Sequence, residues 1–248
     1  MLEPPRWIGW GNYIKLLLED DIFIISLRNT LLFAVITGPV SYLLCLLFAW
    51  IINEFKPRVR SVLTLIFYAP SICGNAYMVW NLILTGDRYG YLNGLLLRLD
   101  LINEPILWMQ TEKYVMPVLI VVQLWLSLGT GFLSFVAGFT NVDKELYDAA
   151  AVDGVTSRFQ RLIYVDIPQT MPQLLFAAVL QITGSLSVGG TLAGHPTPED
   201  AGLTVMLHLS DYSGTRFEVG YASAIAVVLS LLIFGLGRAA FKILGDKG

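Results

Sequence analysis

Charged residues are scarce in this chain of 248 residues: they make up 14% of it, while hydrophobic residues make up 55%. A soluble domain usually carries about 25% charged residues, so the deficit excludes an ordinary water-exposed surface and indicates a lipid environment. The formal net charge of −3 gives no electrostatic basis for a nucleic-acid partner. The N-terminus also lacks the basic start and apolar centre of a signal peptide.

Cysteine and histidine are almost absent, with two of each. Cys45 and Cys73 both fall in apolar stretches, which predicts small buried side chains rather than a disulfide. His195 and His208 have no cysteine or carboxylate at ligand spacing, so we expect ordinary loop residues and no metal site.

Long apolar runs are what the sequence has in abundance. Five windows contain no Asp, Glu, Lys or Arg, and their lengths are 24, 24, 26, 22 and 19 residues. A bilayer core of roughly 30 Å needs about 20 helical residues. The sequence therefore predicts an all-α polytopic membrane protein with a single transmembrane domain over 1–248. The five expected transmembrane helices are about 22–52, 61–84, 114–139, 171–192 and 219–240.

The basic residues indicate which way these helices point. The segments 53–60, 140–170 and 238–248 share one side and hold nine basic residues in 50 positions, against seven in 83 on the other side. Basic residues concentrate on the cytoplasmic side, so we expect the loop 140–170 and the C-terminus there. Met1 would then lie outside. Either a first helix is missing from this chain or the protein is a true five-helix form.

The polar stretch from Glu145 to Pro168 interrupts the apolar pattern. Asp143 is a candidate N-cap for a helix from Lys144 to Asp153, and Gly154 is a natural end for it. Thr156 or Ser157 would cap a second short helix reaching Tyr164. The run Ala149–Ala151 predicts a nearly bare surface that fits a groove on a partner protein, unless the alanines are there only as good helix formers.

This stretch resembles the coupling motif of ABC importer membrane subunits, in which Glu-Ala-Ala, a glycine and Ile-x-Leu-Pro follow at set spacings. Here the motif is DAA at 148–150, Gly154 after three residues, and VDIP at 165–168 after ten more. Aspartate replaces the usual glutamate, and the second spacer is one residue longer. The stretches GWGNYIKLL (9–17), SLRNTLLFAV (26–35) and FEVGYASAIAVVL (217–229) resemble sugar-importing permeases of the maltose and glycerol-phosphate branch, and QITGSLSVGG (181–190) those for complex oligosaccharides.

The resemblance implies a multi-pass subunit in the bacterial cell membrane that binds no cofactor itself. ATP and Mg would be bound by two separate ATPase subunits, and the sequence has no P-loop pattern of its own. A second permease and an extracellular sugar-binding lipoprotein would complete the importer. The expected contacts with the ATPase are Glu145, Asp148, Ala149, Ala150, Asp153, Gly154 and Pro168.

The apolar windows carry no charged side chain near their middle. Intramembrane charge usually marks ion or proton pathways, so its absence argues against proton coupling and a strongly ionic solute. The polar groups that remain suit a neutral polyol, and Asn75, Gln181 and Ser185 are the candidates for the substrate pathway, with Thr183 also on the fourth span. The alternative is that such groups join helices to one another.

Three other classes of membrane protein would leave different marks in the sequence. An intramembrane protease would need a Ser/His pair, paired aspartates or an H-E-x-x-H motif, and the apolar spans contain none of these. A membrane subunit without a transport path would not need the capped alanine surface and Gly154. An ABC permease for a non-sugar solute stays open, because the coupling motif alone does not exclude it.

Overall fold

The protein is described from a computed structural model that covers residues 7–73, 76–188 and 198–245. Every regular element among these residues is helical. In chain order the α-helices are α1 (Gly11–Ile14), α2 (Asp21–Asn53), α3 (Pro57–Ile72), α4 (Ala76–Ile83), α5 (Tyr91–Arg98), α6 (Glu112–Leu126), α7 (Thr130–Thr140), α8 (Lys144–Val152), α9 (Arg158–Arg161), α10 (Ile167–Gln169), α11 (Met171–Leu186), α12 (Val205–Ser210) and α13 (Val219–Gly245). Short turns of other helix types are η1 (Lys15–Glu19), η2 (Leu162–Asp166), η3 (Pro198–Asp200) and η4 (Asp211–Thr215).

Three helices in the described part of the chain are long and apolar enough to cross a membrane. They are α2, the α6–α7 pair over Glu112–Thr140, and α13 over Val219–Lys242. The second predicted span is bent by 87° between Pro57–Ile72 and Tyr77–Ile83, and α11 has only 16 residues. The all-α class with long apolar helices is therefore confirmed, whereas the count of five uninterrupted spans is not.

The third predicted span, 114–139, is broken where α6 ends and α7 begins. The Ser127 hydroxyl donates back to the Leu124 carbonyl at 2.7 Å, a local bond that competes with the helical ladder. The Ser127 carbonyl then accepts from the Gly129 amide at 2.8 Å and from Gln181 Nε2 at 3.2 Å. At the break the Ser127 carbonyl has no helical partner. The break is tolerated because these two donors supply its hydrogen bonds.

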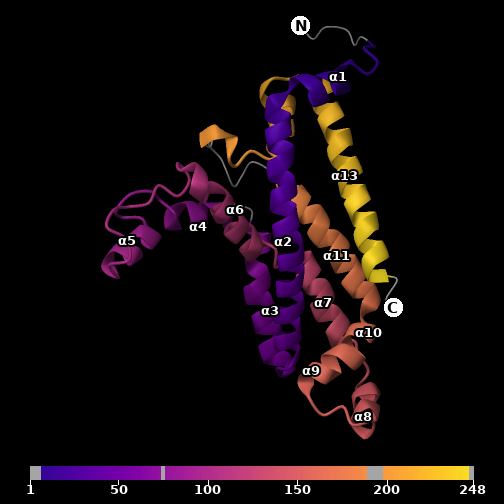
Figure 1. The fold of residues 1–248 in the computed structure, drawn as a ribbon. Coiled ribbons are helices and arrows are strands. Elements are labelled where there is room, and N and C mark those ends of the chain that lie inside the picture. The colour runs from indigo at the N-terminus through magenta and orange to yellow at the C-terminus, as the bar shows by residue number, and fades with distance from the viewer. Residues whose placement is uncertain (1–6, 74–75, 189–197, 246–248) are drawn as a thin grey trace.

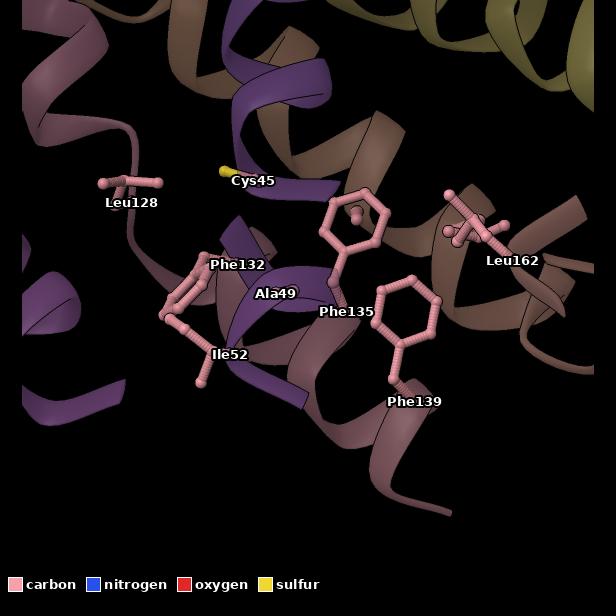
Figure 2. Close-up of a cluster of buried hydrophobic side chains, with 10 residues drawn as sticks. Cys45, Ala49, Ile52, Leu128, Phe132, Phe135, Phe139 and Leu162 are labelled. Carbon is pink, nitrogen blue, oxygen red and sulfur yellow. The ribbon is translucent and has the colours of Figure 1, made fainter. Parts of the chain in front are cut away.

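The core beneath the polar loop is built from aromatic rings on α7 and small residues on α2 (Figure 2). Phe132, Phe135 and Phe139 follow a spacing of three and four residues, which puts them on one helix face. Cys45 and Ala49 are completely buried opposite them, and their small size allows the two helices to approach closely. Cys45 is thus buried as predicted, but Cys73 is exposed in this chain.

The two ends of the bundle carry different structures. Figure 1 shows α8 and α9 projecting at one end of α2, and α1 lying across the other end beside the start of α13. A side branch, formed by α4, α5 and the start of α6, extends away from the bundle. Within it the fully buried Asn93 accepts from the Trp108 indole at 3.0 Å and donates to the Ile106 carbonyl at 3.0 Å.

Candidate functional site

The helix α8 begins and ends where local sequence signals predict. The Asp143 carboxylate accepts a hydrogen bond from the Glu145 amide at 3.1 Å, and the helix runs from Lys144 to Val152. At its end Gly154 has a φ of +88°, a left-handed conformation that glycine adopts without strain. The Val155 amide then donates to the Ala150 carbonyl at 2.9 Å, so the direction of the chain after α8 is set by this turn.

One side of α8 is open to solvent in this chain. Ala149 and Asp148 are exposed, Ala150 is half-buried, and Val152 is 88% exposed. The other predicted coupling residues Glu145, Asp153, Gly154 and Pro168 are also exposed. Figure 1 shows that this helix lies at the tip of the bundle, so its small-residue face is accessible to a partner.

The second short helix is capped as expected but runs further than predicted. The Ser157 hydroxyl accepts from the Gln160 amide and the Gln160 side chain accepts from the Ser157 amide, both at 3.1 Å. This reciprocal pair is a capping box. The helical path does not stop at Tyr164: it continues through η2 and α10 to Gln169, because Pro168 occupies an early position of α10, where a proline is tolerated.

Tyr147 and Asp166 join α8 to the segment that leads into α11. The Tyr147 hydroxyl donates a hydrogen bond to the Asp166 carboxylate, and Asp166 is only 5% exposed. Burial raises the pKa of Asp166, and the nearby Glu54 carboxylate raises it too, against the lowering effects of the Tyr147 bond and Arg161. Burial and the Asp166 carboxylate raise the pKa of Tyr147, so its hydroxyl keeps the proton that it donates.

A polar cavity of about 480 Å³ lies beside this joint. Arg60 closes one side of it by donating to the Asn53 carbonyl at 2.8 Å and to the Thr140 hydroxyl at 3.2 Å. The buried Nε atoms of Arg60 and Arg161 have no hydrogen-bond partner within the described residues. Both arginines line the cavity beside α8. Its lining is Asn53, Glu54, Arg60, Phe139, Thr140, Val142, Lys144, Tyr147, Asp148, Arg161 and Asp166.

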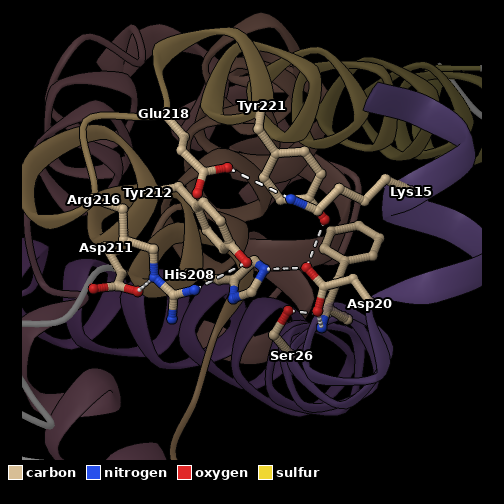
Figure 3. A network of polar contacts seen from close by, with 10 residues as sticks. Lys15, Asp20, Ser26, His208, Asp211, Tyr212, Arg216, Glu218 and Tyr221 are labelled. Carbon is tan, nitrogen blue, oxygen red and sulfur yellow. Dashed lines mark hydrogen bonds and ion pairs between the residues drawn. The ribbon is translucent and has the colours of Figure 1, made fainter. Parts of the chain in front are cut away.

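The opposite end of the bundle holds a buried polar cluster that the sequence did not reveal (Figure 3). His208 was expected to be a loop residue, but it lies on α12, is 4% exposed, and its Nε2 is 3.0 Å from Asp20 Oδ2. The Tyr221 hydroxyl donates to the same Asp20 oxygen at 2.5 Å. The expectation for His208 is therefore wrong, and His195 lies outside the described residues.

Asp20 is the centre of this cluster and also the N-cap of α2. Its Oδ1 accepts from the Phe23 amide at 2.9 Å. Burial alone would raise the pKa of Asp20, but the hydrogen bonds from Tyr221, the Phe23 amide and His208 outweigh burial and hold it below its ordinary value of 3.8. A carboxylate that receives several hydrogen bonds favours its charged form, so Asp20 stays ionised between the start of α2, α12 and α13.

The predicted pathway residues lie between α2 and α11. The Ser41 hydroxyl donates to Gln181 Oε1 at 3.0 Å, and Gln181 Nε2 also lies 3.1 Å from Cys45 Sγ. Ser185 is buried and donates to the Ile182 carbonyl of its own helix. The Gln181 contacts join α11 to α2, which is the alternative that the sequence left open, whereas the Ser185 bond lies within α11. Asn75 lies outside the described residues. Thr183 lines a separate cavity of about 760 Å³ between α11 and α13.

Metal binding has no support in the described part of the chain. Among residues 7–73, 76–188 and 198–245, no group of three or more His, Cys, Asp or Glu side chains is arranged to hold a metal ion.

The described residues combine three membrane-length apolar helices with a capped helix–turn–helix that projects from one end of the bundle, as in a multi-pass membrane protein. Residues 41–245 match the family described as the binding-protein-dependent transport system inner membrane component. The match covers most of the chain, and the chain belongs to this family.

Individual relatives and solved structures agree with this assignment. The chain is 32% identical over 244 residues to the probable ABC transporter permease protein YesP of Bacillus subtilis, covering 95% of this chain and 76% of that protein. It is 27% identical over 245 residues to the lactose transport system permease protein LacF of Rhizobium radiobacter, covering 95% and 80%. A crystal structure of a bacterial ABC transporter that imports the acidic polysaccharide alginate has the same fold, with a TM-score of 0.82 at 19% identity over 97% of this chain and 84% of that one.

Proposed function

We propose that this chain is the membrane subunit of an ATP-driven ABC importer and forms half of the translocation pathway for a sugar or oligosaccharide. LacF is named for lactose, and the structural neighbour imports alginate. The apolar windows of this sequence lack charged residues, which favours a neutral solute over an ionic one. The chain itself is a non-catalytic permease, and ATP with Mg is held by the ATPase.

The observation that carries the coupling role is the accessible small-residue face of α8 at the tip of the bundle. In this proposal α8 docks in a cleft on an ATPase subunit, with Ala149 and Ala150 providing the close fit and Glu145, Asp148 and Asp153 the charged rim. Gly154 sets the angle to α9, and Pro168 begins the path into α11. The Tyr147–Asp166 bond would carry the motion onward. Closure of the ATPase pair then moves α8 as a rigid body.

The proposed topology is a single permease domain over 1–248 with five crossings. The bent pair α3–α4 and the short helix α11 would supply the second and fourth crossings. The loop 140–170 and the C-terminus would lie in the cytoplasm, as the distribution of basic residues indicates. The assembled importer would contain two ATPase subunits, a second permease and an extracellular sugar-binding lipoprotein.

Gln181 and Ser185 are proposed to reach the pathway, together with Asn75. Both described residues lie between α11 and α2 and face Ser41 and Gly38. Since they are buried in this conformation, a sugar would contact them only when these two helices separate, as alternating access requires.

The coupling role is tested in the complete importer, reconstituted with its cognate partners in vesicles. Ala150→Trp and Gly154→Pro should abolish uptake of labelled oligosaccharide while the complex still hydrolyses ATP. Ala239→Trp, at an exposed position on α13, is the matched control and should transport normally. Uptake at the wild-type rate by both α8 variants would refute the coupling assignment.

The solute is tested separately by titrating the cognate binding protein with neutral oligosaccharides, an alginate oligosaccharide, peptides and phosphate. Preference for a neutral oligosaccharide supports the proposal, and preference for the acidic one keeps the sugar class but refutes neutrality. Binding of only peptides or phosphate would establish the alternative, an ABC permease for a non-sugar solute. If the chain were a membrane subunit without a transport path, the reconstituted complex would take up none of these solutes.

A further inference from the structure

The segment from Trp7 to Glu19 is amphipathic. Its outer side carries five large apolar residues: Trp7 and Trp10 just before α1, Ile14 at the end of α1, and Leu17 and Leu18 in η1. Among the described residues nothing covers this face, since Trp7 is 97% exposed, Trp10 74% and Leu18 79%. Leu16, on the opposite side, is completely buried. An apolar stripe that a short helix turns away from its own protein needs an apolar environment elsewhere.

The inner side of the segment is fixed to the bundle by the polar cluster of Figure 3. Lys15 Nζ lies 3.5 Å from Glu218 Oε2 and 4.5 Å from the centre of the Tyr221 ring. At the end of the segment Asp20 accepts the Tyr221 hydroxyl and contacts His208. These contacts determine the rotation of the segment, so the outward direction of the apolar stripe is built into the fold.

The position of the segment identifies what covers the stripe. It packs against the start of α13, where the uncharged window 219–237 begins directly after Glu218. Just below it α2 exposes Ile22 and Ile25, and Figure 1 shows α1 lying across the ends of both helices. The stripe is therefore continuous with the exposed apolar surface of α2 and lies at the level where the uncharged window of α13 begins.

We propose that residues 7–19 form a lipid-bound anchor in the membrane–water interface, at the end of the bundle opposite α8. Trp7 and Trp10 lie at the headgroup level, where amphipathic aromatic rings are favoured, and Leu18 reaches the start of the acyl chains. Because the polar cluster ties this anchor to α2, α12 and α13, it sets the depth of these helices in the bilayer. The proposal depends on neither the solute nor the coupling role of α8.

Tryptophan fluorescence in lipid vesicles tests the proposal with the full-length chain. The sequence has six tryptophans, so the difference between the wild-type protein and Trp7→Phe/Trp10→Phe isolates the two of interest. These variants keep an aromatic ring and leave the inner contacts intact. The difference signal should fall several-fold in lipid brominated near the headgroup end of the acyl chain, less in lipid brominated near the methyl end, and little with aqueous iodide.

Two results would overturn the anchor. Strong iodide quenching without quenching by brominated lipid would place the segment in water. Resistance to both quenchers would mean that protein, such as a second copy or an additional segment, covers the stripe.

A second measurement does not depend on tryptophan. A nitroxide is attached at position 18 through Leu18→Cys in a Cys45→Ala/Cys73→Ala background. Val152→Cys on α8, which is similarly exposed, serves as the matched control. The label at position 18 should collide more with oxygen than with a water-soluble nickel complex, and the label at position 152 should show the reverse. If the labels at both positions collided mainly with the nickel complex, lipid contact at position 18 would be refuted.

Discussion

The hydroxyl of Tyr147 on α8 is hydrogen-bonded to the buried carboxylate of Asp166, 19 residues further along the chain. Tyr147 follows the first turn of α8, and Asp166 ends the η2 turn that leads through α10 into α11. The bond is partly buried and lies where the projecting helix meets the bundle. A movement of α8 by a partner would therefore reach α11 through Tyr147 and Asp166.

Removing this bond should uncouple transport from ATP hydrolysis. Tyr147→Phe keeps the ring but leaves the buried Asp166 carboxylate with one donor fewer, and a hydrogen bond to a charged group is worth about 1.5–3 kcal/mol. We expect uptake by the reconstituted importer to fall about ten-fold or more, while its ATP hydrolysis continues.

Tyr164→Phe is the matched control for this change, because Tyr164 lies on the same loop and its side chain is 68% exposed. It should transport at the wild-type rate. A parallel loss of uptake and ATP hydrolysis in Tyr147→Phe would indicate failed assembly rather than uncoupling, and unchanged uptake would contradict the role of the bond.

The turn after α8 should depend on the absence of a side chain at Gly154. A Cβ there would meet no atom within 4 Å, so the cost of Gly154→Ala is conformational and amounts to about 1–2 kcal/mol. Amide hydrogen exchange in α8 should accelerate by roughly five-fold or more. Gly154→Asn should have a smaller effect, because asparagine tolerates the left-handed region.

Gly184→Ala provides the comparison for Gly154. Gly184 also has open space around it but lies inside α11, where alanine should stabilise the helix by roughly 0.5–1 kcal/mol. If Gly154→Ala left exchange in α8 unchanged, or Gly184→Ala destabilised the protein equally, the backbone explanation would be wrong.

The Asp20 cluster should make stability sensitive to acid. The pKa of Asp20 is lower in the folded protein than the ordinary value of 3.8, so folding favours its ionised form. Its contribution to stability is therefore complete well above pH 3.8 and is lost as the pH falls below that value through the folded-state pKa. The unfolding temperature of the purified chain should therefore fall more steeply than that of Asp20→Asn once the pH drops below about 4.

Asp21→Asn controls for the general effect of acid, since Asp21 is the exposed neighbour of Asp20. It should follow the wild-type profile. Parallel profiles for the wild-type protein and Asp20→Asn would show that the cluster does not stabilise the ionised form of the Asp20 carboxylate.

The features that the sequence predicts well are those set within a few residues. Asp143 and Gly154 act on backbone groups next to them, so the start and the end of α8 are confirmed. Such signals depend on the local chain, so they can be recognised in the sequence without knowing which other elements pack against the helix.

The features that the sequence missed depend on residues far apart in the chain. His208 and Asp20 are separated by 188 positions, and neither has a local pattern that identifies the other. The break between α6 and α7 is likewise possible because Gln181, 54 residues away, donates to the Ser127 carbonyl. A count of apolar residues predicts this span, which the structure has over Glu112–Thr140, but it does not reveal the break within the span, because the break depends on a distant side chain.

Gln181 should be coupled energetically to Gly131, and a double-mutant cycle tests this. A Cβ at Gly131 would lie 2.8 Å from Gln181 Nε2, so Gly131→Ala forces the amide away from Ser127 and Cys45. Gln181→Ala removes the same bonds and leaves the Ser127 carbonyl with one donor fewer, at a cost of about 1–3 kcal/mol.

In the double variant the clash disappears and no bond remains to be lost. The double variant should therefore lose less stability than the sum of the two single variants, by about 0.5–3 kcal/mol. Thermal unfolding in detergent measures the cycle, with Ser185→Ala as the control partner. Within the described residues the Ser185 hydroxyl bonds inside its own helix turn, so Ser185→Ala should combine additively with Gly131→Ala. Strict additivity of Gly131→Ala and Gln181→Ala would mean that the glutamine amide does not hold the α6–α7 break together.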